Sequence, residues 1–140
     1  MTKSTNQLEI SQFRRYIELA SFNIAIDSNT NIDTSCLENM LNKMEDAPMM
    51  DDRVYFDKKL HDFIINASNN QLMISIMDAF SEICESFVGQ MLSCADENKK
   101  KRLTKAHHNI CQSIADRNRA SGIQAINEHY DIIDELIKTQ

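Results

Sequence analysis

Apolar residues recur along this chain at the three- and four-residue intervals of an amphipathic α-helix. Polar stretches typical of turns separate the periodic segments, for example Asp27 to Asn31 and the pair Asn69 and Asn70. The pattern therefore predicts a series of helices. They cover residues 5–26, 35–47 and 50–68, a long segment from residue 70 past residue 91, a segment that ends near residue 118, and residues 120–138.

The apolar faces of two of these helices indicate where the core should lie. On the first helix the repeating apolar residues are Leu8, Phe13, Ile17, Ala20 and Ile24. On the long fourth helix they are Leu72, Ile76, Met77, Phe80, Ile83, Phe87 and Met91. Because one continuous stripe of apolar side chains is the usual sign of a core-facing helix, we expect both faces to be buried.

The composition supports an all-α protein. The chain has 140 residues with only 2 glycines and 1 proline, so turns must be few and the elements long. A chain of this length is large enough to bury a core of its own. We therefore expect a single domain over residues 1–140.

The balance of charges argues against direct contact with nucleic acid. The chain has 15 Lys and Arg against 21 Asp and Glu, a net charge of −6, so it lacks the basic surface that a phosphate backbone needs. The mixed-charge stretch at residues 96–102, DENKKKR, is interpreted as a solvated surface turn. No apolar run approaches the roughly 18 residues of a membrane span, so no membrane segment is expected.

The cysteines and the start of the sequence indicate a reducing compartment. Cys36, Cys84, Cys94 and Cys111 show no C-x-x-C spacing, and the first residues lack the apolar segment of a secretory leader. The cysteines are therefore expected to be reduced and the protein to be cytoplasmic.

The candidate chemistry lies in one aspartate and three histidines. Asp57 and His61 are four residues apart, so on a helix their side chains lie on one face. His107 falls on the buried stripe of its helix, and His129 borders the inner face of the last one, whereas His108 is rotated about 100° away from His107. One carboxylate and three imidazoles suit a divalent transition metal such as zinc, nickel or manganese.

A second interpretation needs no metal. Asp57 and His61 would form an ion pair, and His107 and His129 would be unrelated core histidines. Burying several titratable groups without compensation costs several kcal/mol, however, and one cation would satisfy all four side chains.

The same residues carry a resemblance to a known family. The run DKKLHDFIINASNN, from Asp57 to Asn70, resembles the D-x-x-F-H-x-x-I-x-x-A-S-G-N pattern of the FCD domain, the effector-binding domain of FadR-type GntR-family transcription regulators. His107 and His129, 22 positions apart, are similar to the two later histidines of that domain. Upstream, Arg14 to Glu18 resembles its R-x-x-L-E pattern. The departures, such as Leu60 and Ala106, do not fall on a proposed ligand.

The resemblance implies an antiparallel bundle of six or seven helices around a cavity. In such a bundle Asp57, His61, His107 and His129 would hold the metal, with zinc as the first candidate, and positions would stay open for a small organic acid. The resemblance also implies a sensing domain that forms homodimers and not an enzyme. The winged helix-turn-helix of these regulators is absent from this sequence, so we expect DNA binding only through such a domain.

Two further residues are candidates for contact with the effector. Arg14 is expected to pair with the carboxylate of the acid, although it is equally compatible with a surface position on a long helix. Asn70 is expected to line the effector pocket, or else to cap the fourth helix.

Two other functions stay open on the sequence alone. The metal could activate water in an enzyme that acts on a small carboxylate, with Glu18 as the nearest candidate for a general base. The chain could also be a metal-free helical interaction module.

Overall fold

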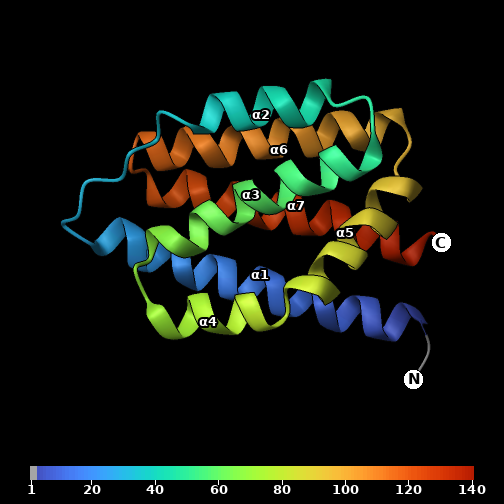
Figure 1. Ribbon diagram of the computed structural model, residues 1–140, viewed down its shortest axis with the longest axis horizontal. Coiled ribbons are helices and arrows are strands. Elements are labelled where there is room, and N and C mark those ends of the chain that lie inside the picture. The colour runs from blue at the N-terminus through green and yellow to red at the C-terminus, as the bar shows by residue number, and fades with distance from the viewer. Residues whose placement is uncertain (1–2) are drawn as a thin grey trace.

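A computed structural model describes residues 3–140, with side chains from residue 6 onward, and all regular structure in this range is helical. Successive helices reverse direction along one long axis, except that α5 continues in the general direction of α4, and together the seven form an antiparallel bundle (Figure 1). The expected all-α class is thus confirmed. The helices are α1 (Lys3–Asp27), α2 (Leu37–Asp46), α3 (Met50–Ala67), α4 (Gln71–Ala79), α5 (Ser81–Cys94), α6 (Glu97–Ala115) and α7 (Arg119–Lys138).

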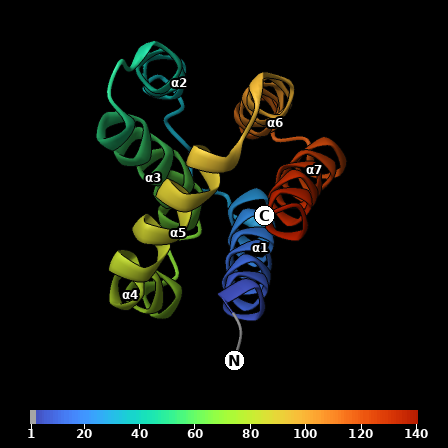
Figure 2. The same cartoon turned by 90° about the vertical axis from the view of Figure 1, so that its right-hand side faces the viewer.

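The bundle has two sides, which Figure 2 shows almost end-on. Helices α1, α6 and α7 lie on one side and α2, α3, α4 and α5 on the other. Helix α7 packs along both α1 and α6, and α3 packs against α1, α2 and α5. Helices α1, α3, α6 and α7 therefore surround the middle of the bundle, and each can contribute side chains to it.

The expected long fourth helix is in fact two helices. Helix α4 ends and α5 begins at Phe80, whose backbone leaves the helical region with φ −101° and ψ 12°. The apolar spacing continues through this break without a glycine or proline to mark it, which is why the sequence predicts one helix. The expectation of a fully buried face is also wrong here, because Leu72, Phe80 and Ile83 are 70%, 44% and 51% exposed.

Side-chain caps set the starts of three helices. Asn70, Asp96 and Asn118 accept hydrogen bonds from the backbone N–H groups at the starts of α4, α6 and α7. The surface turn expected over residues 96–102 is therefore wrong, because Asp96 caps α6 and the helix already begins at Glu97. An acidic cap and an acidic first residue stabilise a helix N-terminus, and the basic residues that follow are part of the helix.

The inward face of α1 is polar, in contrast to the apolar face expected from the sequence. The expected residues from Leu8 to Ile24 are only partly buried. The buried polar residues on this helix are Gln7, Ser11, Arg14, Glu18 and Ser21, while Phe22 and Ala25 near its end are buried apolar residues. The five polar residues follow each other at intervals of three or four residues, so they form one stripe that faces the middle of the bundle.

No helix in the described part of the chain combines the length and the apolar character needed to cross a membrane. The four cysteines are unpaired, as expected from their spacing.

Helices α1 and α7 approach each other closely at Gly122. A Cβ atom on Gly122 would lie 2.0 Å from Cζ of Phe22, a ring that is 1% exposed and packed in the core. Alanine favours a helix over glycine by about 1 kcal/mol, but overpacking a core costs about 1–3 kcal/mol. We expect Gly122→Ala to lower the free energy of unfolding by up to about 2 kcal/mol in urea denaturation.

Gly89 is the matched control, because it also lies inside a helix. The nearest atom to a Cβ at Gly89 is Cγ2 of Val54 at 3.8 Å, an ordinary contact. Gly89→Ala should therefore stabilise the protein by up to about 1 kcal/mol. A Gly122→Ala protein as stable as the Gly89→Ala protein would contradict the close approach of α1 and α7.

Candidate metal centre

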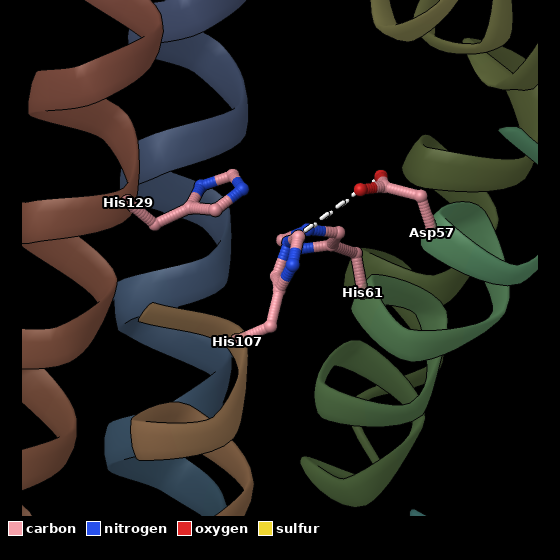
Figure 3. A group of neighbouring side chains, drawn as sticks. All are labelled: Asp57, His61, His107 and His129. Atoms are coloured by element: carbon pink, nitrogen blue, oxygen red, sulfur yellow. Dashed lines mark ion pairs between the residues drawn. The ribbon is translucent and has the colours of Figure 1, made fainter. Parts of the chain in front are cut away.

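The four side chains singled out in the sequence lie together in the middle of the bundle. Asp57 and His61 come from α3, His107 from α6 and His129 from α7, and they point toward one another (Figure 3). All four are buried, and one ligand atom from each lies within 4.8 Å of the others. Three helices from the two sides of the bundle thus meet at one cluster.

The cluster contains nitrogen atoms without a hydrogen-bond partner. His61 Nε2, His107 Nε2 and His129 Nδ1 are buried and unpartnered among the described residues. Buried polar groups are nearly always hydrogen-bonded, because an unpaired one costs on the order of 1–3 kcal/mol. Three such atoms beside one carboxylate are the pattern expected of a cation site.

The spacing of the ligand atoms fits a transition metal. His61 Nε2 lies 3.7 Å from Asp57 Oδ1, and His107 Nε2 lies 3.5 Å from Asp57 Oδ2. These separations are too long for good hydrogen bonds. Ligand atoms about 2.1 Å from a shared ion are about 3.4 Å apart at a tetrahedral angle and about 4.2 Å apart when opposite. Small side-chain rotations would bring all four groups to bonding distance.

Glu18 on α1 orients His61. Both carboxylate oxygens of Glu18 lie 2.8 Å from His61 Nδ1, and the hydroxyl of Tyr130 donates to Glu18 Oε2. Nδ1–H therefore donates to Glu18, which leaves Nε2 directed at Asp57 and the rest of the cluster. A carboxylate that fixes a histidine in this way is a recurrent feature of metal sites, where it raises the basicity of the ligand.

The contacts of Glu18 argue against the general-base role considered for it from the sequence. Its side chain is 1% exposed and engaged by two donors, His61 and Tyr130. The sequence does contain a sign that Glu18 lies near the cluster together with Arg14. The two residues are four apart, so they share one face of their helix. That sign is easily missed, because hydrophobic periodicity ignores polar stripes.

Arg14 lies beside the cluster. Its Nη2 is 4.0 Å from Asp57 Oδ1, and its guanidinium carbon is 5.7 Å from the ring centre of Phe87 and 5.8 Å from that of Tyr130. The side chain is buried, so the alternative of a surface arginine is wrong. Because arginine stays protonated in proteins, this position places a permanent positive charge next to Asp57.

The environment shifts the pKa values of the three histidines in different directions. Burial lowers the pKa of His107 to about 4 and that of His129 well below its usual value, with the charge of His61 adding to both shifts. Burial also acts to lower the pKa of His61, but the carboxylates of Glu18 and Asp57 outweigh it and raise that pKa. At neutral pH His107 and His129 are therefore neutral and have a free lone pair for a metal.

Two hollows adjoin the cluster. The inner one, about 10 Å³, is lined by Arg14, Asp57, His107 and His129 together with apolar side chains. The outer one, about 230 Å³, lies toward the start of α6 and also reaches Asp57 and His107. A larger groove of about 690 Å³ between α3 and α5 contains none of the four cluster residues, so size does not identify the site.

Asn70 and His108 lie apart from these contacts. Asn70 caps α4 through a 3.0 Å hydrogen bond from Met73 N to its Oδ1, and it lines neither hollow. Its contact with an effector stays a prediction. His108 is exposed and pairs with Glu45, in agreement with its expected rotation away from His107.

Comparison with known proteins gives one match to a family. The family model described as FCD domain matches residues 9–132, which is most of the chain and includes all four cluster residues. No match is found among curated proteins.

The pKa of His107 predicts how the stability of the metal-free protein depends on pH. In the unfolded chain a histidine binds a proton near pH 6.5, whereas buried His107 does so only near pH 4. Between these values protons favour the unfolded state, so the free energy of unfolding should fall as the pH falls. In urea unfolding with a chelator present, His107→Gln should reduce this slope by about 1 kcal/mol per pH unit.

His61 provides an internal control of opposite sign. Its raised pKa means that it stabilises the folded state fully below about pH 6.5, and that this contribution is lost as the pH rises through the raised pKa. His61→Gln should therefore change the profile mainly above pH 6.5, with a smaller change below it because the charge of His61 helps to lower the pKa of His107. Identical slopes below pH 6.5 in the native protein and His107→Gln would show that His107 is not held neutral by burial.

Proposed function

The chain belongs to the FCD domain family, the effector-binding module of GntR-type regulators, and on that premise we propose that it senses small organic acids through a bound divalent metal. The observation that carries the proposal is the set of three unpartnered, buried imidazole nitrogens around Asp57. A cluster of this kind is costly unless something satisfies it. A cation satisfies the carboxylate and the imidazoles together.

The ligand set supports a borderline transition metal. Asp57, His61, His107 and His129 offer one oxygen and three nitrogens and no thiolate, which suits zinc first and nickel or manganese as alternatives. Once bound, the metal supplies an electrophilic centre to which an acid can add a carboxylate oxygen. Glu18 holds His61 in the orientation that such binding requires.

Arg14 supports the choice of an organic acid as the effector. Its buried guanidinium lines the inner hollow together with Asp57 and His129. A carboxylate at the cluster would meet this fixed positive charge, and arginine–carboxylate hydrogen bonds are among the strong ones in proteins. Asn70 is retained as a candidate contact of the effector at the periphery.

Sensing is favoured over catalysis by the state of Glu18, a carboxylate beside the cluster that is not a proposed ligand. Glu18 is buried and accepts hydrogen bonds from His61 and Tyr130, so it is not free to take a proton from a substrate or water. The acid would therefore bind and leave unchanged. An enzyme that acts on a small carboxylate is the alternative, and measurement of turnover separates the two.

The position of the cluster offers a route from binding to regulation. The proposed ligands tie α3 to α6 and α7, so an effector that prefers one arrangement of these helices would shift the bundle toward it. In a cytoplasmic homodimeric regulator, this shift would change how two winged helix-turn-helix domains are presented to DNA. The acidic FCD domain would itself make no contact with the DNA.

Metal binding is tested by two neighbouring histidines on α6. His107→Ala removes a proposed ligand and should weaken metal binding by more than about 100-fold, a larger loss than that caused by removing an outer partner of a ligand. His108→Ala removes an exposed imidazole that pairs with Glu45, and should change the affinity by less than about twofold. Competition with a chelator of known affinity measures both. Equal losses would place the metal elsewhere.

Binding of the acid is tested on metal-loaded protein by thermal unfolding with a series of small carboxylates. An acid at about 100 times its dissociation constant should raise the stability by about 2.7 kcal/mol, and the response should vanish when a chelator removes the metal. The acid should be recovered unchanged. Consumption of the acid would favour the enzyme, and metal binding without any response to acids would contradict the sensor.

A further inference from the structure

The outer hollow beside the cluster forms a groove between the metal ligands and solvent. Asp57 and His107 line both this groove and the inner hollow, so the two spaces meet at the same two side chains. From there the groove extends past Arg53 on α3 to Lys100 and Lys101 on α6. A ligand that reaches the cluster from solvent along this path passes these basic residues.

The acidic residues of the groove are already engaged. Glu97 pairs with Lys100 at 3.5 Å, and Glu45 pairs with His108 at 2.5 Å. The third acid, Asp57, belongs to the cluster. Two of the three acids of the groove thus have contacts of their own, and the third belongs to the proposed metal site.

Two of the basic side chains of the groove have no acidic partner among the described residues. Arg53 donates from Nε to the backbone oxygen of Ala47 at 3.2 Å, which fixes the side chain, and its two terminal nitrogens make no ion pair. Lys101 is exposed and makes none either. Arg53 and Lys101 therefore offer two positive charges in one groove, with which a bound anion would pair.

Arg53 is also in register with the cluster. Arg53, Asp57 and His61 are successive at four-residue intervals on α3, so their side chains share one helix face. Four residues of helix rise by about 6 Å. An anion bound beside Asp57 and a second anion bound by Arg53 would thus be separated by the length of a short carbon chain.

We propose that the effector is a short dicarboxylate, of about four to six carbons, that spans the one turn of α3 between Asp57 and Arg53. One carboxylate would bind the metal at the end of the groove formed by Asp57 and His107, and the other would be held by Arg53 with support from Lys101. This inference rests on the proposed function and narrows it from organic acids in general to acids with two charged ends. The terminal nitrogens of Arg53 donate to the distal carboxylate, which accepts.

The test compares glutarate with butyrate, a matched acid that lacks the distal carboxylate, by calorimetric titration of zinc-loaded protein. Glutarate should bind the native protein at least about tenfold more tightly, the effect of one charge-assisted contact. Arg53→Gln should bring glutarate down to the level of butyrate and leave butyrate unchanged. Arg53→Lys, which keeps the cation, should retain part of the preference.

Two lysines on α6 complete the design. Lys101→Gln changes an exposed residue that lines the groove, so it should fold normally and still lower the affinity for glutarate alone. Lys105→Gln changes an exposed residue on the same helix that is outside the groove, and it should affect neither acid. If Arg53→Gln fails to fold, Lys101→Gln carries the test.

The outcomes separate this inference from the function on which it rests. Equal affinity of native protein for butyrate and glutarate, or an unchanged ratio in both Arg53→Gln and Lys101→Gln, would overturn the two-ended acid and leave the sensor intact. If neither acid nor any other carboxylate binds the zinc-loaded protein, the sensing function itself is wrong.

Discussion

The structure depends on the burial of Asp57 among three imidazoles at the point where the two sides of the bundle meet. Each of these groups would be more stable in water than in an apolar core, so their joint burial requires compensation. Glu18 compensates at the outer nitrogen of His61, and Arg14 places its charge beside Asp57. The three imidazole nitrogens that remain without a partner among the described residues face the middle of the cluster, and they are the basis of the proposed metal site.

The same requirement explains the unusual character of α1. A helix that packs in the middle of a bundle normally presents an apolar stripe, whereas the buried stripe of α1 is polar from Gln7 to Ser21. Two members of this stripe, Arg14 and Glu18, serve the cluster, and Ser11 donates to Asp134 on α7. Helix α1 is therefore best described as the support of the cluster, and it is held by specific polar contacts in addition to apolar burial.

The sequence predicts the all-α class and the proximity of the four cluster residues, but not every feature of the helices around them. The positions of Asp57, His61 and His107 follow from helical spacing alone, because each lies at a fixed rotation from apolar neighbours that must be buried. The role of Glu18 does not follow, since it depends on how α1 is turned against α3 and α7. The break at Phe80 is hidden for a related reason: an apolar pattern can continue in phase across two helices that diverge in space.

The four cluster residues come from α3, α6 and α7. The cluster can therefore be completed only late in the synthesis of the chain. Asp57 and His129 lie more than half the chain apart, so a ribosome-bound chain that has produced α3 holds only two of the four groups. Bringing residues so far apart in the sequence together has an entropic cost. The two groups on α3 alone make too few contacts to offset that cost. If the cluster binds an ion, all four proposed ligands are available only after α7 has been synthesised. The ion would then bind to a domain that is already almost completely folded.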